Sequence, residues 1–164
     1  MNNNEISTII NLCSSYLDKS ILKNPKDFAN LLGITIKEED SPLINSSLIV
    51  NDKEKTITIN KDLKEIIKNY YIILELVEYL LHYNVNSIID IKCNIEYDTN
   101  TSRITNELLM PYDKFILIYK ELVDNNYPEN EIISILSNVF EVPREVISNR
   151  ICNLNNDVKK KVLN

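Results

Sequence analysis

The stretch YYIILELVEYLLH, residues 70–82, decides how this chain folds. Placed on a helical wheel at about 100° per residue, its apolar side chains surround nearly the whole helix, a pattern typical of a buried helix. Tyrosines aside, its polar side chains are Glu75, Glu78 and His82, which fall within one sector of about 60°. Because an unpaired buried carboxylate costs several kcal/mol, these side chains either reach water through a gap in the core or form the floor of a cleft.

The pattern on both sides of this helix predicts an α+β fold. Upstream, alternating apolar residues and turn residues predict a small antiparallel sheet of about three strands, at 34–36, 47–50 and 55–60. The helix itself is predicted to begin at Lys61, with Asn60 as its N-cap. Downstream, periodicity and proline positions predict a mostly helical body, with helices at 99–110, 112–124, 128–140 and 143–154.

The length of 164 residues favours one main domain. We assign this domain to residues 24–154. It is preceded by an amphipathic N-terminal helix within residues 1–23 and followed by a polar tail at 155–164. We expect no secretory signal, because the first residues lack a basic segment followed by an apolar one.

Charge and cysteine content narrow the class of protein. The formal net charge of −6 disfavours direct binding of nucleic acid, and no apolar run is long enough to span a membrane. The cysteines Cys13, Cys93 and Cys152 are odd in number and far apart, which favours buried thiols in a reducing compartment. We therefore expect a cytoplasmic protein without direct contact with nucleic acid or membrane; its oligomeric state is not indicated.

Two motifs point to a family. Residues 73–82 read ILELVEYLLH, and residues 100–111 read NTSRITNELLMP. The first resembles the zinc-binding helix A-H-E-L-G-H-Y-L-L-H of the ImmA/IrrE family of metallopeptidase-like proteins, and the second resembles that family's E-A-N-x-F-A-A-E-L-L-M-P segment. Weaker similarities at 31–34, 56–60 and 140–150 extend the resemblance over about residues 24–154. It implies a zincin-like scaffold.

The chain departs from this family at the metal ligands. In an H-E-x-x-H helix the two histidines bind zinc and the glutamate acts as general base. By the resemblance, the histidine positions fall on Leu74 and Glu78, and the third ligand position falls on Asn100. Only the general-base position, Glu75, is retained. Leucine offers no lone pair and asparagine is a weak neutral ligand, so we expect no cofactor and an idle Glu75.

A different ligand set is the alternative. In this alternative, Glu75, Glu78 and His82 hold a divalent ion such as zinc together with Cys93, Glu96 or Asp98. However, Glu75, Glu78 and His82 stand at i, i+3 and i+7, which spreads their donors over about 10 Å of helix. That distance is long for a single ion, whose bonds to carboxylate or imidazole are about 2 Å.

Active relatives in the family cut helix-turn-helix repressors and so release genes of prophages and other mobile elements. For this chain the resemblance implies a degenerate pseudo-peptidase that regulates transcription by binding such a repressor, or another protein partner, without cleaving it. The alternative is an active metalloendopeptidase with substituted ligands. A third class is a DNA-binding module, since helices 128–140 and 143–154 loosely resemble a helix-turn-helix that carries Arg144 and Arg150.

The hypothesis of a partner-binding pseudo-peptidase predicts two sets of functional residues. The expected cleft is formed by Glu75, Glu78, His82 and Glu107. The expected peptide-binding edge strand presents Thr56, Thr58 and Asn60.

Overall fold

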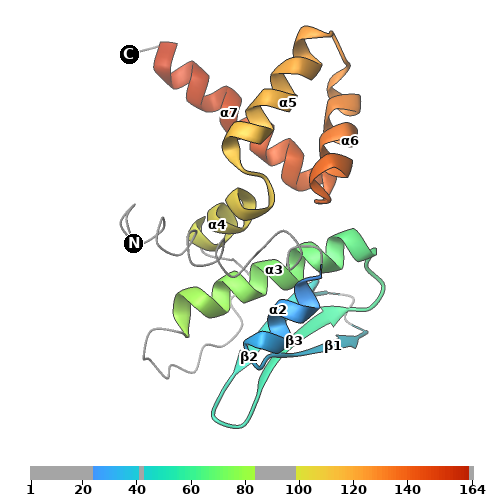
Figure 1. Ribbon diagram of the computed structural model, residues 1–164, viewed down its shortest axis with the longest axis vertical. Coiled ribbons are helices and arrows are strands. Elements are labelled where there is room, and N and C mark those ends of the chain that lie inside the picture. The colour runs from blue at the N-terminus through green and yellow to red at the C-terminus, as the bar shows by residue number, and fades with distance from the viewer. Residues whose placement is uncertain (1–23, 41–42, 84–98, 163–164) are drawn as a thin grey trace. The chain divides into compact units, whose positions relative to one another are not determined.

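The computed structural model describes residues 24–40, 43–83 and 99–162, and it confirms the α+β class (Figure 1). The chain divides into two compact units, residues 1–108 and 109–164. The described elements of the first unit are α2 (Pro25–Leu31), β1 (Thr35–Glu39), β2 (Ser46–Val50), β3 (Lys55–Asn60), α3 (Glu65–His82) and nearly all of α4 (Thr99–Leu109). The predicted N-terminal helix lies outside the described residues.

The sheet is mixed, and this corrects the expectation of a purely antiparallel one. Its strand order is β1-β3-β2. The predicted hairpin of β2 and β3 is present and antiparallel, but β1 lies on the other side of β3 and runs parallel to it. This pairing sets Ile36 beside Ile57, so that both apolar side chains lie on one face of the sheet.

The position of β3 contradicts its predicted role as an edge strand. β3 is the middle strand; residues 55–59 pair with β2 and residues 56–60 pair with β1. A peptide therefore cannot add to Thr56, Thr58 or Asn60, because their backbone groups are already used inside the sheet. The two outer strands of the sheet are β1 and β2.

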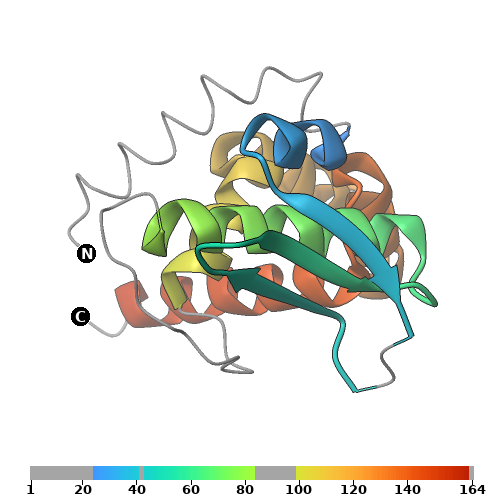
Figure 2. The ribbon, with the colours of Figure 1, turned by 90° about the horizontal axis from the view of Figure 1, so that it is seen from below.

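Helix α3 packs against the sheet (Figure 2). Ile57 and Ile59 of β3 are completely buried, as is Leu76 of α3, while Leu74 and Val77 are almost completely buried. The periodicity thus predicted a buried helix correctly.

The start of α3 differs from the prediction. Asn60 is not its N-cap: the Asn60 Oδ1 atom accepts a hydrogen bond from the backbone N–H of Asp62 at 3.0 Å, which forms a separate turn. The helix begins only at Glu65, with Lys64 at the N-cap position.

The second unit consists of α5 (Tyr112–Asp124), α6 (Glu129–Phe140) and α7 (Arg144–Val162). Phe115 and Phe140 pack with ring centroids 5.7 Å apart. α7 continues to Val162, so most of the segment 155–164 that we expected to be a tail is helical.

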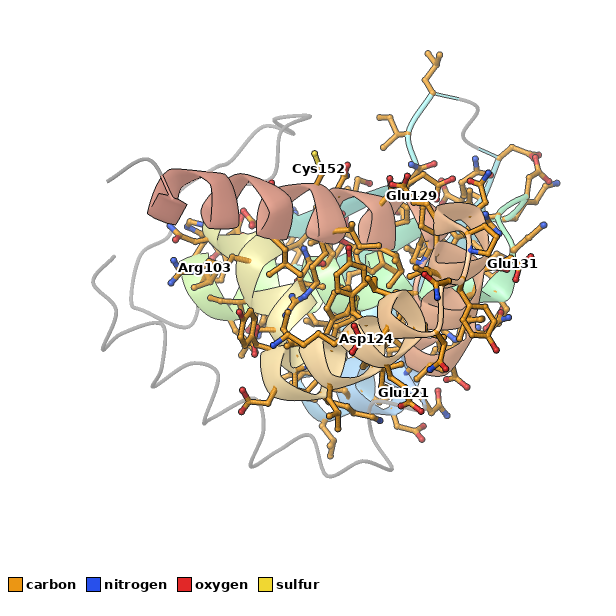
Figure 3. The ribbon with its side chains drawn as sticks, turned by 90° about the horizontal axis from the view of Figure 1, so that it is seen from above. Arg103, Glu121, Asp124, Glu129, Glu131 and Cys152 are labelled. Carbon is orange, nitrogen blue, oxygen red and sulfur yellow. The ribbon has the colours of Figure 1, made fainter. Side chains whose placement is uncertain are left out.

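The Cys152 side chain, labelled on α7 in Figure 3, is exposed, which corrects the expectation of buried thiols for this cysteine; Cys13 and Cys93 lie outside the described residues. In the part of the chain that the structure describes, no helix has the length and apolar character needed to cross a membrane.

A group of three charged side chains joins α2, β1 and α3. Glu38 of β1 accepts a hydrogen bond from Lys68 Nζ at 2.6 Å and one from Lys26 Nζ at 3.2 Å. Lys68 is buried, whereas the side chain of Lys26 is 42% exposed. The hydrogen bond from Lys68, and then the one from Lys26, lower the pKa of Glu38 below its usual value of 4.5.

Replacing Glu38 tests this ion-pair group. We expect Glu38→Gln to reduce the free energy of unfolding at neutral pH by about 1 kcal/mol or less, because the Glu38 side chain is 38% exposed and water screens its charge. Since the folded-state pKa is lowered, the contribution of Glu38 is present above pH 4.5 and is lost as the pH falls through the folded pKa.

Urea unfolding from about pH 6 to pH 3 measures this. The wild type should lose stability more steeply than Glu38→Gln in this window. Lys26→Gln, which removes the more exposed partner, should cost less than Lys68→Gln. Equal pH dependence of the wild type and Glu38→Gln would contradict the assignment.

Candidate functional site

The site predicted from the sequence is centred on α3, and Leu74 belongs to the packed core of that helix. The Leu74 side chain is only 3% exposed. Its neighbours along the helix, Ile73 and Leu76, are buried as well. A buried isobutyl group at this position contributes apolar packing and no metal-binding atom.

Glu75 is buried and faces the sheet. Its side chain is 3% exposed, and its Oε1 atom accepts a hydrogen bond of 2.7 Å from the hydroxyl group of Ser46 at the start of β2. One helical turn earlier, the Tyr71 hydroxyl accepts a hydrogen bond of 2.8 Å from the side-chain amide of Asn45. Two adjacent residues of the chain are therefore bonded to two adjacent turns of α3.

Glu78 faces α4 instead. Its Oε2 atom accepts a hydrogen bond from the Thr101 hydroxyl group, and its Oε1 atom lies 3.4 Å from His82 Nε2. The Glu78 side chain is 24% exposed and the His82 side chain 38%. Both oxygens of this carboxylate thus have a partner within the protein.

A second contact joins α3 to α4. The Tyr70 hydroxyl donates to Asn106 Oδ1 at 3.4 Å. Burial raises the pKa of Tyr70 to about 12, so the phenol stays protonated and able to donate at physiological pH.

The three polar side chains predicted to share one sector of α3, Glu75, Glu78 and His82, therefore do not form one cluster. Glu78 and His82 lie together beside α4, whereas Glu75 is bonded to β2. Asn100 and Glu107, the other residues of the expected site, are half-buried on α4. Sequence reasoning missed Ser46 and Thr101, since a single hydroxyl residue carries no signal of its partner until the fold is known.

The described residues do not fit a zinc ion. Nowhere in residues 24–40, 43–83 and 99–162 do three or more His, Cys, Asp or Glu side chains gather closely enough to hold a metal. Of the three ligand positions that the resemblance indicates, Leu74 has no donor atom and Asn100 has only a weak one. The alternative ligands Cys93, Glu96 and Asp98 lie outside the described residues.

Two identical substitutions on α4 test the contact with Glu78. We expect Thr101→Val to lower the free energy of unfolding by about 1–2 kcal/mol, because it removes the hydroxyl that donates to a partly buried carboxylate. Thr105→Val is the matched control one turn later: among the described residues, the buried Thr105 hydroxyl has no hydrogen-bond partner. That variant should be neutral or more stable than the wild type.

Chemical denaturation of both variants measures the two effects. If Thr101→Val and Thr105→Val cost the same, then the Thr101–Glu78 hydrogen bond does not stabilise the protein.

The comparisons with known proteins agree with the motifs. A family model described as the IrrE N-terminal-like domain, Peptidase_M78, matches residues 29–152. No curated protein and no solved structure matches the chain. The matched range runs from α2 into α7 and includes both α3 and the segment that ends in Glu107-Leu108-Leu109-Met110-Pro111. The chain thus belongs to the family of IrrE N-terminal-like domains, the ImmA/IrrE-type metallopeptidase-like proteins.

Proposed function

We propose that this chain is a catalytically inactive member of its family that binds a protein partner without cleaving it. The observation that carries the proposal is Leu74, which is buried in the core at the position where the family motif has its first zinc-binding histidine. Without that ligand, and with an asparagine at the third ligand position, the donor set is too small for a catalytic zinc site.

The surroundings of Glu75 support the same proposal. A general base must reach a water molecule or a substrate proton. The Glu75 side chain is 3% exposed and its Oε1 atom is bonded to Ser46. This environment favours a structural use of the carboxylate.

The outer edge of β2 is the proposed binding site for the partner. In an antiparallel pair, residues alternate between inward and outward backbone groups. Because the N–H of Asn60 bonds to the carbonyl of Asn45, the inward residues of β2 are Ser47 and Ile49. The N–H and C=O groups of Leu48 and Val50 then point to the outer edge of β2, with which no strand of the described residues pairs.

The chemistry of β2 suits an extended apolar segment. Its sequence, SSLIV, carries no charge that would discourage strand addition. Three apolar side chains near this edge are exposed: Leu43, Ile44 and Ile49, at 94%, 43% and 41%. We propose that an extended segment of the partner adds to β2 as a further strand. By the family resemblance, we expect the partner to be a helix-turn-helix repressor.

Direct DNA binding is the weaker alternative. Within the second unit, Arg144 bonds to the carbonyl of Asn130, and the Arg150 guanidinium lies 5.1 Å from the centroid of the Phe115 ring. The side chains of four acidic residues on α5 and α6 are exposed: Glu121, Asp124, Glu129 and Glu131 (Figure 3). Such carboxylates repel phosphate groups.

Metal content tests the loss of catalysis. The purified, untagged protein would be incubated with zinc, freed of excess metal on a column and analysed by elemental mass spectrometry. We expect far less than one zinc ion per chain in a protein that circular dichroism shows to be folded. The positive control is Leu74→His, Glu78→His and Asn100→Glu combined, which rebuilds the ligand set of the family and should retain about one zinc ion.

About one zinc ion per wild-type chain would overturn the proposal. If Glu78→Ala or His82→Ala then removed that ion, the alternative would hold: a metalloendopeptidase with substituted ligands.

A lysine on the outer edge strand tests the binding site. We expect Ile49→Lys to abolish capture of any partner that the wild type retains, because lysines on edge strands oppose strand addition. Leu117→Lys is the matched control, since Leu117 is an exposed apolar residue on α5, and its capture should equal that of the wild type. Loss of capture in both variants, or in neither, would contradict a site at β2.

A further inference from the structure

We propose that Glu75 is a positioning residue: together with Tyr71, it holds the beginning of β2 in the place where a partner strand would add. The inference rests on the proposed function, since it gives the general-base position of the family motif a new role at the proposed binding edge. It concerns geometry alone and involves no metal and no reaction.

The contacts form a repeated pattern. Tyr71 and Glu75 stand four residues apart and therefore lie on the same face of α3. Their partners, Asn45 and Ser46, are consecutive in the chain. The two hydrogen bonds measure 2.8 Å and 2.7 Å, and Ser46 is itself buried. A pair of adjacent anchors fixes both the position and the direction of the chain where β2 begins.

The two ends of β2 are held in different ways. At its far end, the backbone N–H of Asn51 bonds to the carbonyl of Glu54, and the Asn51 side chain accepts from Lys53 and Glu54. This tight turn fixes the far end locally. The beginning of β2 follows a longer connection that carries the exposed Leu43 and Ile44, so it depends on contacts from elsewhere in the fold.

Ser46 links the anchor directly to the edge. Its side chain is bonded to Glu75, and the outward-pointing backbone groups of Leu48 follow two residues later in the same strand. On the side that faces β3, the backbone carbonyl of Asn45 accepts a hydrogen bond of 3.0 Å from the backbone N–H of Asn60. The start of β2 is therefore held by α3 and β3 together.

Two substitutions of Glu75 separate a positioning role from a catalytic one. In Glu75→Gln, the side-chain carbonyl oxygen still accepts from the Ser46 hydroxyl group, but the amide cannot act as a base. In Glu75→Leu, the acceptor is lost while the volume is nearly kept. Only a positioning role predicts that Glu75→Gln keeps the beginning of β2 in place while Glu75→Leu releases it.

Amide hydrogen exchange of the full-length protein, followed by NMR, measures how firmly the beginning of β2 is held. We expect Glu75→Leu and Ser46→Ala each to raise the exchange rates of the Ser47 and Asn60 amides by about tenfold, with the amides of α5 unchanged. Glu75→Gln should keep the wild-type rates. In the Glu75→Leu, Ser46→Ala double variant, the two effects should be less than additive, because both substitutions remove the same hydrogen bond.

Wild-type exchange rates in Glu75→Leu would overturn the proposal, as would rates in Glu75→Gln equal to those in Glu75→Leu. If Glu75→Leu fails to fold, Ser46→Ala and Glu75→Gln still decide: faster exchange in the first and wild-type rates in the second are the required results. The experiment contains neither zinc nor partner, so its failure is distinct from the failure of the metal and capture experiments that test the proposed function.

Discussion

The fold of the first unit depends on one constraint: a helix buried on nearly all sides cannot leave its carboxylates without partners. α3 supplies the apolar surface that covers the sheet, yet it carries Glu75 at a position that is only 3% exposed. The energy needed to bury an unpaired carboxylate is several kcal/mol, a large part of the total stability of a domain of this size. The Ser46 hydroxyl group removes this penalty in part, and in doing so it fixes where β2 lies along α3.

The same constraint operates on the side of α3 that faces α4. Glu78 accepts a hydrogen bond from the Thr101 hydroxyl group and lies beside His82, and the Tyr70 hydroxyl group donates a hydrogen bond to Asn106. α3 is thus joined to β2 on one side and to α4 on the other through side chains that the family motif would associate with metal chemistry. In the described residues, hydrogen bonds between protein groups join these elements.

The sequence predicted what is local and left open what is not. The bounds of β3 and α5, and the buried character of α3, follow from periodicity within a few residues and were predicted correctly. The order of the strands was not predicted correctly. Alternation of apolar and polar residues identifies a strand but does not indicate which strands it pairs with, and β3 is the middle strand. At the site, the motif located Glu75 and Glu78. Their partners Ser46 and Thr101 are separated from them by 29 and 23 residues, and only the folded chain brings them together.

The energetic cost of burial is consistent with the residues that stand at the two histidine positions of the motif, Leu74 and Glu78. A histidine at position 74 would place a polar ring among buried apolar side chains, and without a metal its nitrogen atoms would need other partners. Leucine at that position needs none, and its burial contributes about 1.5–3 kcal/mol. At position 78, the carboxylate accepts a charge-assisted hydrogen bond from the Thr101 hydroxyl group, and this contact needs no metal. Glu75 still stabilises this arrangement, because its carboxylate accepts the hydrogen bond from Ser46 whether or not zinc is bound. An intact glutamate in a metallopeptidase motif is therefore not evidence for proteolysis when the fold itself requires its carboxylate.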